Sequence, residues 1–162
     1  MKKQLSGIAW LFYLTTLQAQ FYIQSDSKVI FADSVLVTLR NIDFENHRDL
    51  SMEEMAERYR QADAVVFAST YEGFGMPVVE AQATGRPVIT SNIEPMMWVA
   101  GAEGACFVDP FNPESMRAGI ERVIQDENFR NQLTKNGLEN VKRYSIGQIA
   151  GQYIQLYQKF LN

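Results

Sequence analysis

The chain has 162 residues, of which 46% are hydrophobic, and a formal net charge of −4 with a pI near 5.0. This length and apolar content suit one globular domain with a continuous core. The acidic balance leaves no basic footprint, which argues against nucleic acid or an anionic membrane surface as the main partner. The only cysteine is Cys106, so an intramolecular disulfide and a cysteine-based zinc site are excluded.

The N-terminal segment has two interpretations. Met1-Lys2-Lys3, the apolar residues 5–17 and Gln18-Ala19-Gln20 together imitate a secretory signal. The apolar stretch is too short for a membrane span, which needs about 20 residues. Its apolar side chains recur at helical spacing, so we prefer a buried helix. Short strands are expected next, over Gln20–Gln24 and within Ser34–Ile42.

The middle of the chain carries clearer signals. Ser51 is followed three residues later by Glu54, a capping box that predicts a helix ending near Ala62. Residues 64–68 form an unbroken apolar run with β-branched side chains, which is typical of a parallel strand buried on both faces.

This strand is expected to lead into a loop at residues 69–76 and then a helix. Pro77 can open that helix, because the first helical position does not need its N–H. Gly85 closes the helix, and a second strand follows at Pro87–Thr90.

The rest of the chain is expected to be mostly helical. An irregular stretch through Gly104 leads to a third strand at Ala105–Val108, and Asn112-Pro113 then opens a helix. Another helix is predicted over Asn128–Asn140 and a last one from Ser145. Strands that alternate with helices predict an α/β fold with a mainly parallel sheet. The last helix has a one-sided apolar row, typical of a packed face: Ile149, Tyr153, Leu156, Tyr157 and Phe160. The alternative is that part of this face is exposed or self-paired where no second domain covers it.

The loop at residues 69–76 is the candidate binding site, because open parallel sheets bind ligands beyond the carboxyl ends of their strands. Gly73 and Gly75 permit a close backbone approach, and the following helix offers free N–H groups to an anion such as phosphate. Glu80 lies about one turn into that helix, eight residues after Glu72. Both carboxylates can therefore border one cleft.

Glu72 and Glu80, with Gly73-Phe74-Gly75 between them, resemble the paired-glutamate motif of the family-four (group 1) retaining GT-B glycosyltransferases. The resemblance extends over about residues 50–160. It implies one half of a GT-B fold: a Rossmann-like parallel sheet flanked by helices, forming a single nucleotide-sugar-binding domain. The residues that agree with this family in order and spacing are Ala62-Asp63-Ala64, Ser69, Glu72-Gly73-Phe74-Gly75, Pro77, Glu80-Ala81, Gly85, Pro87-Val88-Ile89-Thr90-Ser91 and Val108-Asp109-Pro110.

The resemblance also implies roles for individual residues. Glu80 would hydrogen-bond the ribose of the sugar donor, and Glu72, the candidate catalytic residue, would lie beside the transferred sugar. Ser91 is a candidate contact to the nucleotide, with a capping or turn role as the alternative, and Lys3 resembles the lysine of the family's basic pair. The sugar donor or its diphosphate would contact the backbone amides of Gly73, Phe74, Gly75 and Met76. No metal and no separate cofactor are expected.

The implied reaction transfers a sugar from a UDP- or GDP-sugar to a glycan or lipid-linked acceptor, with retention of configuration, in polysaccharide biosynthesis. The expected location is the cytoplasm, or the periphery of the inner membrane face. Residues 1–49 match the family poorly, since the first strand and its arginine are missing, and we expect no acceptor-binding domain within the chain. An alternative is a degenerate, non-catalytic interaction module that forms a homodimer or pairs with a separate acceptor-domain chain. A third is another GT-B-like enzyme, such as an epimerase.

Overall fold

The computed structural model describes residues 19–21, 29–31, 37–39 and 50–161. Parallel strands form the main sheet in the order β2-β4-β5-β6. Two further strands, β1 (Ala19–Phe21) and β3 (Val37–Leu39), pair in parallel with each other. The strands of the main sheet are β2 (Val29–Phe31), β4 (Ala64–Phe67), β5 (Val88–Ser91) and β6 (Cys106–Val108). The α/β fold with a parallel sheet is therefore confirmed.

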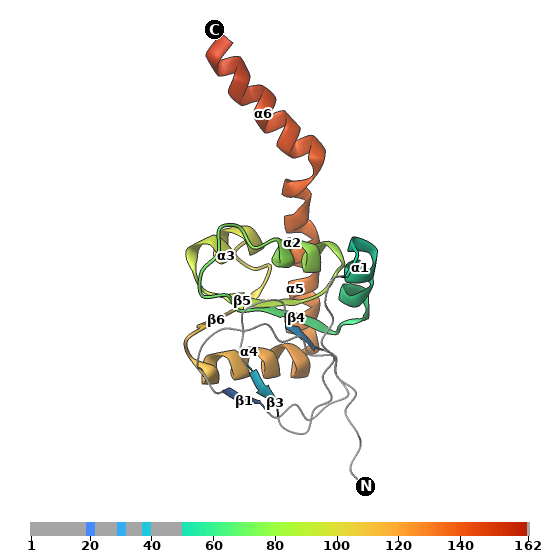
Figure 1. The fold of residues 1–162 in the computed structure, drawn as a ribbon, viewed down its shortest axis with the longest axis vertical. Helices are drawn as coiled ribbons and strands as arrows, with labels where there is room; N and C mark the ends of the chain where they lie inside the picture. Colours follow the sequence, from blue (N-terminus) through green and yellow to red (C-terminus); the bar gives the residue numbers. More distant parts are fainter. Residues whose placement is uncertain (1–18, 22–28, 32–36, 40–49, 162) are drawn as a thin grey trace.

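Helices cover both faces of the main sheet (Figure 1). On one face lie α2 and α3, and on the other lies α4, which separates the main sheet from the β1-β3 pair. The helices are α1 (Met52–Gln61), α2 (Met76–Ala83), α3 (Glu94–Ala100), α4 (Pro113–Gln125), α5 (Glu127–Asn140) and α6 (Ile146–Leu161), with a 3-10 turn η1 (Val141–Tyr144) before α6.

Side-chain caps explain where two of these helices begin. At α1, the Ser51 hydroxyl accepts from the Glu54 amide, while the Glu54 carboxylate accepts from the Ser51 amide at 2.9 Å. Hydrogen bonds from Ser51 hold the pKa of Glu54 below its usual value. At α4, Asn112 Oδ1 accepts from the amides of Glu114 and Ser115. The capping signals predicted from the sequence are confirmed at both sites.

The core lies between the two helical layers. All residues of β4 and β5 are buried, as predicted for strands covered on both faces. At Gly119 of α4, a β-carbon would lie 2.4 Å from Cγ1 of Val108, so this helix sits directly on the sheet. The largest fully buried side chains are Phe67, Ile89, Met96, Ile120, Gln82, Val65, Val66, Val78, Val88, Val99 and Val123. Complete burial of one such apolar side chain contributes about 1.5–3 kcal/mol.

One part of the sequence prediction is wrong. The stretch before Gly104, expected to be irregular, contains helix α3. This helix has only seven residues and no side-chain cap at Ile93, so its local signal is limited to Glu94 and Pro95 in the first turn. Its helical conformation comes with burial of Met96 and Val99 against the sheet. Strand β2 was also not predicted, and the helix expected over residues 5–17 lies outside the described residues.

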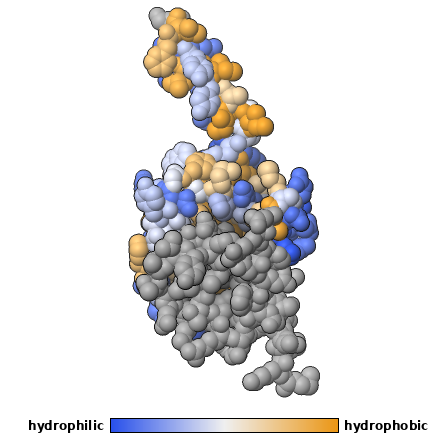
Figure 2. All heavy atoms as spheres, viewed as in Figure 1, coloured by the Kyte–Doolittle hydropathy of each residue, from blue (hydrophilic) through white to orange (hydrophobic). Residues whose placement is uncertain are grey.

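The C-terminal helix α6 projects away from the rest of the domain (Figure 1). Its apolar row does not pack against the domain in this structure, and apolar side chains lie exposed along the helix, which is one of the two arrangements expected from the sequence (Figure 2). The exposed side chains are Ile146, Ile149, Tyr153, Ile154, Leu156, Tyr157, Phe160 and Leu161. Among the described residues, no helix is both long and apolar enough to span a bilayer.

Candidate functional site

The loop that joins β4 to α2 leaves the sheet at the carboxyl end of β4, as predicted. Helix α2 begins at Met76, one residue before the predicted start, and Pro77 is its second residue. Gly75 is the N-cap, with a left-handed backbone conformation at φ 87°. A β-carbon at this position would lie 2.5 Å from Cε of Met96. Gly75 is thus favoured by its conformation, and a larger residue would also have to displace the end of the Met96 side chain.

Buried hydroxyl groups hold the start of the loop against β5. Ser69 Oγ donates to the carbonyl of Tyr71 at 2.9 Å. Ser91 Oγ donates to the carbonyl of Ser69, and Thr90 Oγ1 donates to the carbonyl of Phe67 at 2.7 Å. The hydroxyl of Ser91, a candidate nucleotide contact, is therefore engaged with the loop itself. These bonds fix the path of the chain into the glycine-containing segment.

The glycine-containing segment presents backbone N–H groups at the start of α2. Among the described residues, the amides of Gly73, Phe74, Gly75 and Met76 have no hydrogen-bond partner. Unpaired amides at a helix start lie at the positive end of the helix dipole, where an anion is stabilised. A β-carbon on Gly73 would meet no atom within 4 Å. The segment therefore combines free amide donors with open space.

The side chain of Phe74, which belongs to this segment, packs against a residue of the turn η1. Its ring packs edge-on against Tyr144, with 5.6 Å between the ring centroids. Tyr144 is held in turn by its hydroxyl, which donates to the carbonyl of Val99 at 3.0 Å, and it lies beside Trp98. The turn η1 and helix α3 thus position the side chain of Phe74.

The two glutamates of the motif are both half-buried but differ in their surroundings. Glu80 Oε2 accepts a hydrogen bond at 3.0 Å from the phenol of Tyr59, at the end of α1. No partner is seen for the Glu72 carboxylate among the residues that the structure describes. Glu80 is thus held in place by the fold, whereas Glu72 is available to a ligand.

Sequence reasoning missed Tyr59. This side chain is only 4% exposed, and burial followed by the nearby Glu80 carboxylate raises the pKa of its phenol well above the usual value. Met52, Met55 and Tyr59 recur at helical spacing, but Met52 and Met55 are exposed, so this apolar pattern does not identify the inner face of α1. Its partner 21 residues away along the chain has no local signal either.

The candidate cation and a metal ion also bear on anion binding at this site. Lys3, the candidate cation, lies outside the described residues. Within the described ranges, no group of three His, Cys, Asp or Glu side chains is arranged to hold a metal ion. We therefore attribute the attraction of an anion at this site to the free amides of residues 73–76 and to the start of α2.

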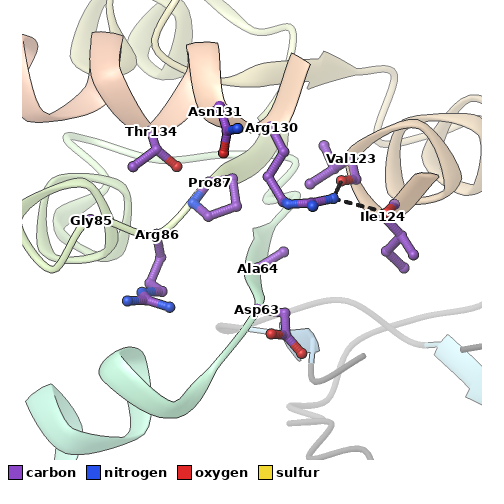
Figure 3. A pocket seen from close by; sticks show the side chains of 10 residues that line it. All are labelled: Asp63, Ala64, Gly85, Arg86, Pro87, Val123, Ile124, Arg130, Asn131 and Thr134. Carbon is purple, nitrogen blue, oxygen red and sulfur yellow. Dashed lines mark hydrogen bonds between the residues drawn. The ribbon is translucent and has the colours of Figure 1, made fainter. Parts of the chain in front are cut away.

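A cavity of about 530 Å³ lies at the opposite edge of the sheet, beside the first residue of β4 (Figure 3). Its two arginines are bound to carbonyl groups at helix ends. Arg130 Nη1 donates to the carbonyls of Val123 and Ile124, each at 2.9 Å, and Arg86 Nη1 donates to that of Ala62 at 3.0 Å. No residue from Glu72 to Glu80 lines this cavity.

Known proteins resemble this chain over the same region. The family model for glycosyl transferases group 1 matches residues 40–140. The O-antigen chain mannosyltransferase B of Escherichia coli is 34% identical over 106 residues, which are 65% of this chain and 28% of that protein. The chain spans about a quarter of the length of the curated relatives that it matches.

Solved structures agree with this assignment. Sucrose-phosphate synthase from Thermosynechococcus elongatus superimposes with a TM-score of 0.61 at 30% identity, over 75% of this chain and 30% of that one. Anabaena Alr3699/HepE, solved in complex with UDP and glucose, gives a TM-score of 0.68 over 96% of this chain and 49% of the other. Its 15% identity bears on the fold alone. The chain therefore belongs to the glycosyl transferases group 1 family and has the fold of one half of a GT-B enzyme.

Proposed function

We propose that the loop before α2 binds the diphosphate of a nucleotide sugar, as the donor-binding C-terminal domain of a retaining glycosyltransferase. The observation that carries the proposal is the set of unpaired amides at residues 73–76, next to the half-buried Glu72 and Glu80. A diphosphate is the anion that such amides and a helix start favour. The bound UDP and glucose of Alr3699/HepE support a nucleotide sugar as the ligand class.

The chemistry follows from where charge develops. Breaking the bond between the sugar and the diphosphate places positive charge on the sugar and negative charge on the departing diphosphate. Amides that already point at the anion stabilise this change without reorganising. We assign the leaving diphosphate to the amides of Gly73–Met76, the ribose to Glu80 and the transferred sugar to Glu72. This assignment needs no metal ion.

Calorimetric titration with UDP and with GDP tests the proposal. We expect one of the two to bind saturably, with the same affinity in EDTA as in magnesium chloride. If neither nucleotide binds at millimolar concentration, the chain has no nucleotide-sugar site. If the affinity is higher in magnesium chloride than in EDTA, nucleotide binding uses a metal ion, and the proposal that none is needed is wrong.

Retention and the acceptor need product analysis. The curated relative named as an O-antigen chain mannosyltransferase supports a glycan or lipid-linked glycan acceptor, in polysaccharide biosynthesis. Proton NMR of the product reports its anomeric configuration directly. An inverted configuration relative to the sugar nucleotide would exclude the retaining mechanism.

One observation favours a second function. The apolar side chains along α6 are exposed, including Phe160 at 81% and Leu161 at 83%, and exposed apolar stripes of this kind mark interaction surfaces. The alternative is therefore a non-catalytic module that associates through α6. Sedimentation analysis over a range of protein concentrations separates the two. A dimer without nucleotide affinity favours the module, and a monomer that binds nucleotide favours the enzyme.

A further inference from the structure

We propose that Tyr59 is a positioning residue, whose phenol holds the Glu80 carboxylate so that its second oxygen faces the ribose hydroxyls of the nucleotide. The inference rests on the proposed function, because it takes Glu80 as the ribose-binding residue. It adds a residue of α1 to a site otherwise built from the β4–α2 loop and α2.

The contact geometry supports this role. The phenol oxygen of Tyr59 lies 3.0 Å from Oε2 of Glu80 and donates to it. Among the described residues, Oε1 of Glu80 has no hydrogen-bond partner. One oxygen of the carboxylate is thus committed to the protein, and the other remains open to a ligand.

The buried ring of Tyr59 restricts the conformations of the Glu80 carboxylate. A glutamate side chain rotates about several bonds, and ordering it on binding lowers affinity. Tyr59 is buried in the core cluster, where close packing restricts its ring. The phenol therefore holds the carboxylate before the nucleotide arrives, so that binding does not have to order the Glu80 side chain and loses less entropy.

Tyr59 also keeps its proton at neutral pH. Burial and the neighbouring carboxylate both raise the pKa of the phenol, so it acts as a hydrogen-bond donor throughout the physiological range. A carboxylate that accepts from a fixed phenol at one oxygen can accept from a ribose hydroxyl at the other. The pairing suits a ribonucleotide better than a deoxyribonucleotide.

The test compares UDP and GDP with their 2′-deoxy counterparts by calorimetric titration of the full chain. Tyr59→Phe keeps the buried ring and removes only the hydroxyl. We expect about threefold to tenfold weaker binding of the ribonucleotide, with a smaller loss for the 2′-deoxy nucleotide. In a Glu80→Ala background, adding Tyr59→Phe is expected to have no further effect on affinity.

Thr84→Val is the matched control. Thr84 lies at the other end of α2, where its hydroxyl donates to the Ala81 carbonyl at 2.9 Å. The same hydroxyl also donates to the backbone carbonyl of Glu80 at 3.2 Å. Thr84→Val therefore removes hydroxyl hydrogen bonds from the same helix without removing a contact of the Glu80 carboxylate, and the ratio of ribonucleotide to deoxynucleotide affinity should not change. Tyr59→Leu is a second variant that also lacks the hydroxyl, and it should change this ratio in the same direction as Tyr59→Phe.

The outcomes separate the two proposals. Wild-type protein that binds neither UDP nor GDP overturns the proposed function, and the positioning role with it. Wild-type binding that Tyr59→Phe leaves unchanged or tightens overturns the positioning role alone. Equal losses for the two nucleotide types, or a full additional loss in the Glu80→Ala background, would show that Tyr59 acts only on the stability of the domain.

Discussion

Gly75 packs so closely against Met96 that a β-carbon on the glycine would lie 2.5 Å from Cε of the methionine. Its φ of 87° is also one that other residues adopt at a cost. Gly75→Ala should therefore lower the free energy of unfolding by about 1–3 kcal/mol. Urea denaturation measures the change.

Gly73→Ala is the matched control in the same loop. No atom lies within 4 Å of a β-carbon built there, so we expect its stability to stay within about 0.5 kcal/mol of wild type. The added methyl group would instead occupy space beside the free amides, and nucleotide affinity should fall. Equal destabilisation by the two substitutions would contradict the packing described for Gly75.

The two glutamates should respond differently to truncation. Glu80→Ala removes the proposed ribose contact, and a hydrogen bond to a charged group supports a loss of about tenfold or more in affinity for the nucleotide that binds. Glu72→Ala should change that affinity by less than about threefold, because UDP and GDP lack the sugar beside which Glu72 is proposed to lie. Calorimetric titration of both variants measures the difference. Equal losses would refute the assigned roles.

Gln82 should be the polar residue on which the stability of the domain depends most. This side chain is buried, and its amide donates to the carbonyls of Ala100 and Gly104, each at 2.9 Å. Its oxygen accepts from Asn140, at 2.8 Å. Gln82→Leu would leave buried carbonyls without donors, at a cost of about 2–4 kcal/mol in the free energy of unfolding by chemical denaturation.

An exposed glutamine provides the control for the loss of stability expected of Gln82→Leu. Gln132 donates to Asn136 on the surface of α5, and Gln132→Leu is expected to change stability by less than about 0.5 kcal/mol. Since Gln82 and Asn140 share a hydrogen bond, Gln82→Leu and Asn140→Ala together should cost less than the sum of their separate effects. Additive losses would mean that the shared bond contributes nothing.

Stability should fall in alkaline solution because of Tyr59. The folded protein raises the pKa of this phenol, so above pH of about 10 the unfolded chain releases its proton more readily than the folded chain does. The free energy of unfolding then decreases as pH rises further. Denaturation between about pH 8 and 11 should show a shallower decrease for Tyr59→Phe than for wild type. Parallel curves would contradict the raised pKa.

Much of the fold could be predicted because its signals are local. The capping box at Ser51 and Glu54 defines the start of α1 within a few residues of sequence, and the apolar run at residues 64–68 reads as a covered strand. Helix α3 has a weaker local signal, with Glu94 and Pro95 in its first turn but no side-chain cap, and it buries Met96 and Val99. The prediction failed where tertiary packing outweighed local preference.

The candidate site divides in the same way. The order of glycines and glutamates in residues 71–80 predicted the candidate binding loop, because open parallel sheets bind ligands beyond the carboxyl ends of their strands. The hydrogen bond of Ser91 could not be predicted from the sequence, because its hydroxyl donates to the carbonyl of Ser69, 22 residues earlier in the chain. The difference between Gly73 and Gly75 also came only from their surroundings in space.

The sequence by itself determined the family, the α/β class and the position of the loop before α2, since these depend on the order and spacing of residues near one another in the chain. Only the tertiary structure decided which groups in that loop are free and which are already bonded. It joined Tyr59 to Glu80 across 21 residues and left the apolar row of α6 exposed. Such contacts join residues that are far apart in the sequence, whereas the sequence signals used for prediction lie within single helices, strands or loops.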